Sequence, residues 1–160
     1  MSIKDLVFLF KDEFFEEVQA AIYRLPFFHS KGKYSKMSKK QYRIIQLLIS
    51  YALESNLHYK HAACLVRGGK IIKIGINSPF IHAEEKILKY KNKGVTLYVI
   101  RIIVSDGEIV LKESKPCRDC SKLINDYGIK KVVYSTTDGI MLEKGKLFNN
   151  EHISSSRRLV

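Results

Sequence analysis

Two of the three cysteines in this chain stand three residues apart, in the stretch Pro116-Cys117-Arg118-Asp119-Cys120. Residues at positions i and i+3 lie on one face of a helix, so both sulfurs can reach one ion from its first turn. Pro116 suits a helix start because it has no N–H to lose. Zinc favours thiolate and imidazole ligands, but a C-x-x-C motif alone also fits a redox pair or two buried thiols. A zinc site therefore needs a further ligand from elsewhere in the chain.

The length of 160 residues and the 46% hydrophobic content indicate a single globular domain with its own core. No apolar run approaches the ~20 residues that span a bilayer, and the N-terminus lacks the basic region and cleavage site of a secretory signal. We therefore expect an intracellular protein that does not bind membranes, in the cytoplasm or the nucleus. In a reducing compartment, C-x-x-C favours metal binding over a disulfide.

The formal net charge of +12 predicts attraction to polyanions or to small phosphorylated substrates. Basic residues gather between Phe27 and Arg43, a stretch without acidic residues that we expect to be a loop because of Gly32 and its serines. This stretch could bind nucleic acid, with its basic side chains on phosphates and a tyrosine stacked on a base. A solvated basic loop without a partner is an equal alternative. The candidate contacts are Lys31, Lys33, Tyr34, Lys36, Lys39, Lys40 and Arg43.

The periodicity predicts three parts: an N-terminal helix and basic loop packed on the core (1–37), a core domain (38–148) and a polar tail (149–160), which is either disordered or a surface strap. The core alternates helices with strands, which indicates an α/β fold. The segment 136–139 is too short for a parallel crossover, which needs about a dozen residues, so the last strand should return antiparallel. Helices are expected at 4–25, 39–54 (N-capped by Ser38), 82–91 and 117–127, and strands at 62–66, 71–76, 97–104, 108–111, 131–135 and 140–142.

His82 supplies the missing metal ligand, because it opens a helix after a strand, as Cys117 does. Two helix starts can converge on one ion, so we predict that His82, Cys117 and Cys120 bind Zn²⁺. Two thiolates cancel the charge of Zn²⁺ and leave its bound water less acidic, which makes a nearby base useful. Glu84, two residues after His82, is the predicted base. Cys64 falls inside a strand, where a buried thiol is expected.

His82-Ala83-Glu84 followed by Pro116-Cys117-Arg118-Asp119-Cys120 resembles the H-x-E…P-C-x-x-C signature of the cytidine and deoxycytidylate deaminase superfamily. The segment 61–77, which ends in Gly75-Ile76-Asn77, is similar to the opening hairpin of that family. The segment 121–134 is similar to its later helix, Gly-Ile turn and strand. The resemblance covers roughly residues 39–142, and leaves out the N-terminal helix, the basic loop and the tail.

The resemblance implies a three-layer α/β/α fold, with a mixed sheet of about five strands flanked by helices, to which this chain adds an N-terminal helix. It implies that His82, Cys117 and Cys120 hold zinc, while Glu84 moves a proton from the water at the metal to the base. Cytosine in a nucleoside or nucleotide, or in nucleic acid, would become uracil with loss of ammonia. Asn77 matches a position that contacts the substrate near the pocket, although a turn residue capping the strand end is an equal reading.

The substrate class stays open at this level. The antiparallel last strand resembles the branch of the family that acts on free nucleosides, whereas Ser121-Lys122-Leu123-Ile124 resembles deoxycytidylate deaminases. The branch that acts on adenosine in tRNA has a similar core, so adenine stays open as the substrate base. Family members acting on free nucleotides commonly form homo-oligomers. We favour surface positions for His58 and His61, with the pocket rim as the alternative. A different class is also possible: a non-catalytic nucleic-acid-binding or packaging protein that keeps the zinc fold as a scaffold.

Overall fold

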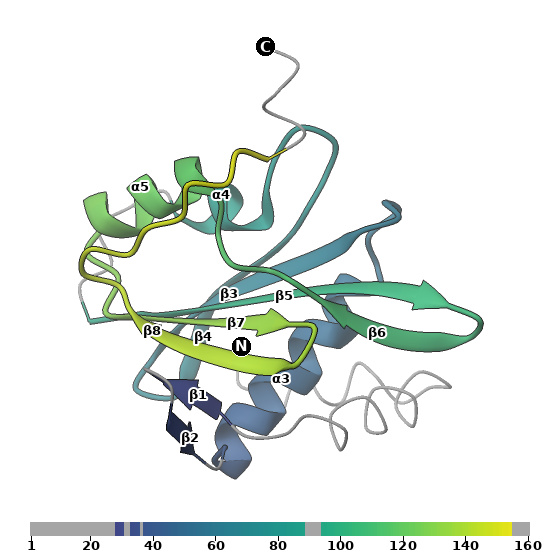
Figure 1. Ribbon diagram of the computed structural model, residues 1–160, viewed down its shortest axis with the longest axis horizontal. Helices are drawn as coiled ribbons and strands as arrows, with labels where there is room; N and C mark the ends of the chain where they lie inside the picture. The colour runs from purple at the N-terminus through teal and green to yellow at the C-terminus, as the bar shows by residue number, and fades with distance from the viewer. Residues whose placement is uncertain (1–27, 31–32, 36, 89–93, 155–160) are drawn as a thin grey trace.

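The computed structural model describes residues 28–30, 33–35, 37–88 and 94–154 (Figure 1). The predicted N-terminal helix over 4–25 and the end of the tail, 155–160, lie outside these residues, and the proposed division of the chain at 37/38 and 148/149 stays a prediction. Within the described part of the chain, no helix has the length and apolar character that crossing a bilayer requires.

One mixed sheet organises the described residues, in the order β2-β1-β8-β7-β5-β3-β4, with β6 paired to β5. Strands β5 and β7 run parallel, whereas β3 pairs antiparallel with both β4 and β5. Each predicted strand forms. The sheet has more strands than the expected five or so, because β6 and the short edge strands β1 and β2 join it. The strands are β1 (Phe28–Ser30), β2 (Lys33–Ser35), β3 (Lys60–Arg67), β4 (Lys70–Ile76), β5 (Thr96–Ser105), β6 (Glu108–Lys112), β7 (Lys131–Thr136) and β8 (Gly139–Lys144).

Helices cover both faces of the sheet, which confirms the three-layer α/β/α architecture (Figure 1). Helix α3 (Lys39–Ala52) packs on one face, and α4 (Ala83–Ile87) and α5 (Arg118–Asp126) pack on the other. Alternate residues of the central strands divide between the two layers: Cys64 and Ile100 face α3, while Ala63 and Val99 face α4 and α5. The strands in the middle of the sheet are therefore buried on both sides, as the apolar run in β5 predicts.

Helix α3 begins with the expected cap. The Gln41 N–H donates to Ser38 Oγ at 3.2 Å, and the Ser38 N–H donates to Gln41 Oε1 at 2.8 Å, which forms a reciprocal capping box. The helix ends at Ala52, two residues before the predicted end. Its second half is buried over most of the helix circumference; the buried residues are Ile44, Ile45, Leu47, Leu48, Ile49, Ser50 and Ala52.

Two tight hairpins follow from residues that tolerate positive φ. Gly68 and Gly69, with φ of 56° and 76°, join β3 to β4, and Asp106 and Gly107, with φ of 51° and 76°, join β5 to β6. Two central residues with positive φ make the turn whose twist matches that of paired strands. The predicted antiparallel return is also present, with Thr136 opposite Gly139 and Lys131 opposite Lys144.

Two sequence-based expectations were wrong. The basic stretch is not simply a loop, because β1 and β2 form a hairpin and β1 pairs parallel with β8, Phe28 opposite Ile140. The edge of β8 offers unpaired backbone groups that a strand can use, and three-residue strands leave no periodic signal. The helix after His82 ends at Ile87 rather than residue 91, because Leu88 adopts φ −86° and ψ 63°, outside the helical region.

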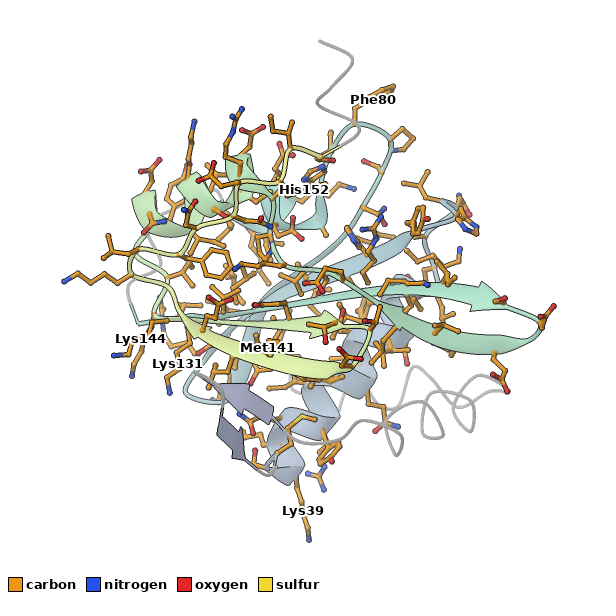
Figure 2. All side chains as sticks on the ribbon, in the orientation of Figure 1. Lys39, Phe80, Lys131, Met141, Lys144 and His152 are labelled. Atoms are coloured by element: carbon orange, nitrogen blue, oxygen red, sulfur yellow. The ribbon has the colours of Figure 1, made fainter. Side chains whose placement is uncertain are left out.

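The described part of the polar tail, 149–154, is a strap. The Arg118 N–H at the start of α5 donates to the His152 carbonyl at 2.9 Å, and Asn150 Nδ2 donates to the Pro116 carbonyl at 3.1 Å. His152 lies beside α5 and α4, on the side of the sheet opposite Lys39 (Figure 2). The tail therefore runs along the same side of the sheet as α4 and α5, whose first turns carry the predicted zinc ligands.

Candidate metal centre

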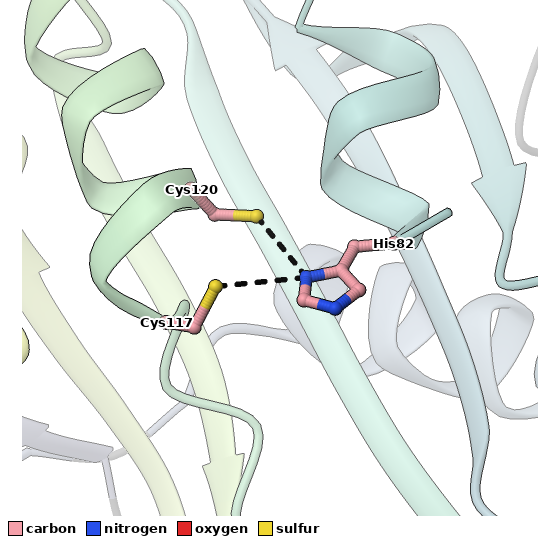
Figure 3. A group of neighbouring side chains, drawn as sticks. All are labelled: His82, Cys117 and Cys120. Carbon is pink, nitrogen blue, oxygen red and sulfur yellow. Dashed lines mark hydrogen bonds between the residues drawn. The ribbon is translucent and has the colours of Figure 1, made fainter. Parts of the chain in front are cut away.

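The two halves of the predicted site come from the starts of α4 and α5. His82 is the N-cap of α4, Cys117 is the N-cap of α5, and Cys120 lies in the first turn of α5, so the three side chains converge (Figure 3). Gly75 in β4 permits the close approach of α4: a Cβ there would lie 3.1 Å from Ile87 Cγ2 and 3.2 Å from the Ala83 carbonyl. A side chain at position 75 would push α4, and His82 with it, away from the sheet.

A buried serine pair holds the chain that leads to the cysteines. Ser114 Oγ donates to the Val99 carbonyl at 2.9 Å and accepts the Ser135 N–H at 2.7 Å, which ties this segment to β5 and β7. The Ser114 N–H also donates to the Ser135 carbonyl at 2.8 Å. These bonds fix the chain three residues before Cys117. Sequence reasoning missed Ser114, because a serine between a strand and a helix has no distinctive pattern.

The donor atoms of His82, Cys117 and Cys120 all lie within 4.8 Å of one another. Nδ1 of His82 is 3.6 Å from Cys117 Sγ and 3.4 Å from Cys120 Sγ. Tetrahedral zinc, with bonds of about 2.1 Å to nitrogen and about 2.3 Å to sulfur, needs nitrogen–sulfur separations of about 3.6 Å. One imidazole and two thiols therefore fit a zinc ion with one coordination position left over.

The thiols are electrostatically poised for a cation. Hydrogen bonds from Cys120 and from His82, opposed by burial, hold the pKa of Cys117 at about 4. The same proton sharing, together with burial, raises the pKa of Cys120. The hydrogen bond to Cys117 raises the pKa of His82. One thiolate is thus already favoured without the metal, and a bound metal would replace the shared protons, because metal ligands must be deprotonated.

Glu84 lies beside the ligand atoms. Its side chain is buried at 3% exposure, and its Oε2 accepts a hydrogen bond from Cys120 Sγ at 3.3 Å and lies 3.9 Å from His82 Nδ1. Burial raises the pKa of this carboxyl. A carboxyl group with a raised pKa next to an open coordination position is suited to exchange a proton with a molecule bound there.

The family model for the cytidine and deoxycytidylate deaminase zinc-binding region matches residues 36–136. The chain belongs to this family. No curated protein matches it. The matched range contains all four residues of the centre, and the His/Cys/Cys cluster fits the zinc site of a deaminase. The match ends at residue 136, the last residue of β7, so β8 and the tail that reaches His82 lie outside the matched range.

The other candidate residues of the deaminase lie in different places. Asn77 follows β4 and caps the start of β3: its Oδ1 accepts the His61 N–H and the Ser55 hydroxyl, each at 2.9 Å, and its Nδ2 donates to the Tyr59 carbonyl at 2.9 Å. This arrangement fits the turn-residue reading, and a substrate contact stays a prediction.

The basic stretch is not gathered at the zinc centre. Lys39, Lys40 and Arg43 are exposed on α3, which covers the opposite face of the sheet. Lys33 and Tyr34 belong to β2 at the sheet edge, and Lys31 and Lys36 lie outside the described residues. Lys39, Lys40 and Arg43 are therefore separated by the sheet from a substrate bound at the metal of the same chain.

Two residues near the centre were missed or misjudged. His58 is exposed as expected, but the surface position favoured for His61 is wrong: this residue is half-buried at the start of β3 with its Nε2 buried, and burial lowers its pKa to about 3. Arg101, opposite His61 on β5, was overlooked. A cation within an apolar strand was the available signal, since such a residue seldom occupies a buried sheet without a partner.

Proposed function

We propose that this chain is a zinc-dependent hydrolytic deaminase that converts cytosine to uracil in a nucleoside or nucleotide. The observation that carries the proposal is the position of the Glu84 carboxylate, 3.3 Å from Cys120 Sγ and 3.9 Å from His82 Nδ1, beside a three-donor cluster with one coordination position to spare. A purely structural zinc site uses four protein ligands. A site with three ligands and an adjacent carboxylate is arranged for hydrolysis.

The reaction adds water across the N3–C4 double bond of cytosine and then breaks the bond from C4 to the amino nitrogen, which leaves uracil and ammonia. Zinc supplies a Lewis acid that makes water nucleophilic at neutral pH. His82, Cys117 and Cys120 would hold the ion from two fixed helix starts. Glu84 accepts a proton from the attacking water and delivers it to ring nitrogen N3; it then accepts the proton of the new hydroxyl on C4 and passes it to the amino nitrogen, which leaves as ammonia. Its burial excludes bulk water from these transfers.

A mass-spectrometric substrate panel tests this function. Purified protein is incubated with cytidine, deoxycytidine, their 5′-monophosphates, adenosine, and single-stranded DNA and RNA, each with wild type and Glu84→Ala. We expect an amine-to-carbonyl mass change on a cytosine substrate and its loss in Glu84→Ala while zinc is retained. Turnover of adenosine alone would contradict the cytosine assignment, and no turnover of any substrate would contradict the enzyme.

A second candidate function is binding to RNA or DNA. The net charge of +12, and the exposed Lys39, Lys40 and Arg43 on the face away from the metal centre, favour it. Nucleic-acid binding with a steep salt dependence, reduced by charge-removing substitutions at these three residues and without deamination, would support a binding protein. Absent or salt-insensitive binding would exclude it.

A further inference from the structure

His61 and Arg101 form a polar pair on the sheet beneath the metal centre. They are opposite each other in the antiparallel β3–β5 pairing. Side chains two residues apart in a strand share a face, so His61 lies on the face of Ala63 and Leu65, and Arg101 on that of Leu97 and Val99. Those four residues pack with α4 and α5 in one core cluster. The pair therefore occupies the layer of the sheet that carries His82, Cys117 and Cys120.

Both side chains carry buried polar atoms without a hydrogen-bond partner among the described residues. These atoms are Nε2 of His61 and Nε of Arg101. Leaving such a group unsatisfied costs about 1 to 3 kcal/mol, so two adjacent cases in one place call for an explanation. The electrostatic interactions of His61 include His82, and those of Arg101 include Glu84, so the pair lies within the field of the metal centre.

The guanidinium of Arg101 is held in place yet still available to a ligand. It stacks over the Tyr59 ring at 4.2 Å, and its Nη1 donates to the Glu113 carbonyl at 3.4 Å. No carboxylate among the described residues forms an ion pair with it within 4.0 Å, and the residue is only partly buried. Stacking leaves the edge of the planar fork free for hydrogen bonds.

We infer that Arg101, backed by His61, binds the phosphate of the substrate, so that the enzyme acts on a nucleoside monophosphate in preference to the free nucleoside. This inference rests on the proposed deaminase function. A guanidinium fork fits phosphate with two parallel charge-assisted hydrogen bonds. Nε of Arg101 is a donor without a partner, and Nε2 of His61 beside it, a donor in one tautomer of the ring, also lacks one. Lys39, Lys40 and Arg43 are exposed on α3, on the other face of the sheet, whereas Arg101 lies in the layer of the metal centre.

Binding measurements on zinc-loaded protein test the inference. A Glu84→Gln background prevents turnover, and the variants are Arg101→Gln, Arg101→Lys and the control Arg67→Gln, which removes the same charge from an exposed residue at the other end of β3. Circular dichroism and zinc content establish that each variant is folded. The ligands are cytidine, cytidine 5′-monophosphate and a single-stranded oligonucleotide with one cytosine, and inorganic phosphate serves as a competitor.

We expect Arg101→Gln to weaken monophosphate binding about 10- to 100-fold, Arg101→Lys to weaken it less, and both to leave cytidine binding within about twofold. Phosphate should compete with the monophosphate in the parent protein but not in Arg101→Gln, and Arg67→Gln should change nothing. Equal losses for cytidine and its monophosphate, or an effect confined to the oligonucleotide, would overturn the inference while leaving the deaminase intact. Failure to bind any cytosine ligand would overturn both.

Discussion

Ser154→Ala should weaken zinc binding through His82. A zinc-ligating histidine donates its second ring N–H to a neighbouring group, which fixes the tautomer and the ring orientation, and losing that group typically lowers metal affinity 10- to 100-fold. Here Nδ1 faces the cysteines, and Nε2 lies 3.1 Å from Ser154 Oγ. The His82 side chain is 15% exposed, so water can partly replace the hydroxyl. We therefore expect the lower limit, about 10-fold or about 1.4 kcal/mol.

The assay is competition for zinc between the protein and a fluorescent chelator at fixed pH. The backbone bond from Arg118 to the His152 carbonyl does not involve the Ser154 side chain, so the strap should remain in the variant. Ser154→Thr keeps a hydroxyl and should restore most of the affinity, and Ser105→Ala, at an exposed serine in β5, is the control. A zinc dissociation constant for Ser154→Ala within twofold of wild type would refute the positioning role of this hydroxyl.

Three further predictions concern stability and thiol chemistry. Phe80 is 72% exposed (Figure 2) with φ of 68°, so Phe80→Gly should stabilise the protein by about 1 kcal/mol and raise Tm by about 3 °C, whereas Phe80→Ala should not; equal Tm values for both variants would contradict the strain argument. Burial lowers the pKa of His61 to about 3 from 6.5, so the stability that depends on its neutral ring is complete above pH 6.5 and is lost as pH falls. Between pH 6.5 and 5, the free energy of unfolding in urea should fall by about 2 kcal/mol more in wild type than in His61→Phe. Equal decreases in the two proteins would contradict this. Burial raises the pKa of the Cys64 thiol, and the pKa of Cys120 is also raised, whereas that of Cys117 is held at about 4. Cys117 should therefore be alkylated first when a chelator removes zinc, and modification of Cys64 in folded protein at the same rate would contradict this.

Most of the fold follows from local signals in the sequence. Ser38, the Gly68-Gly69 turn and the apolar run of β5 each act through short-range physical chemistry, so the elements that they predict are present. The hairpin of β1 and β2 depends on the edge of β8, more than 100 residues away in the chain. Its three-residue strands carry no periodicity, so only tertiary pairing determines them.

The metal centre was predictable because its ligands follow a fixed chemical spacing. The expected four side chains meet, because each lies at the N-cap or in the first turn of a helix: His82 and Glu84 in α4, Cys117 and Cys120 in α5. The surroundings of the centre were not predictable. Arg101 reaches this layer through the register of β3 against β5, and Ser154 reaches His82 through the path of the tail. Arg101 stands out in the sequence as a cation within an apolar strand, but neither the strand register nor the path of the tail leaves a pattern there.

Zinc titration of metal-free protein, with deamination of cytidine 5′-monophosphate as the readout, tests the central claim most directly. A chelator removes the metal, and activity is measured as zinc returns in sub-stoichiometric steps. We predict no activity without metal, a linear rise that stops at one zinc per chain, and no recovery in Cys117→Ser or in zinc-loaded Glu84→Gln. Activity in the metal-free protein, or full activity in Glu84→Gln, would contradict a zinc deaminase in which Glu84 moves the protons.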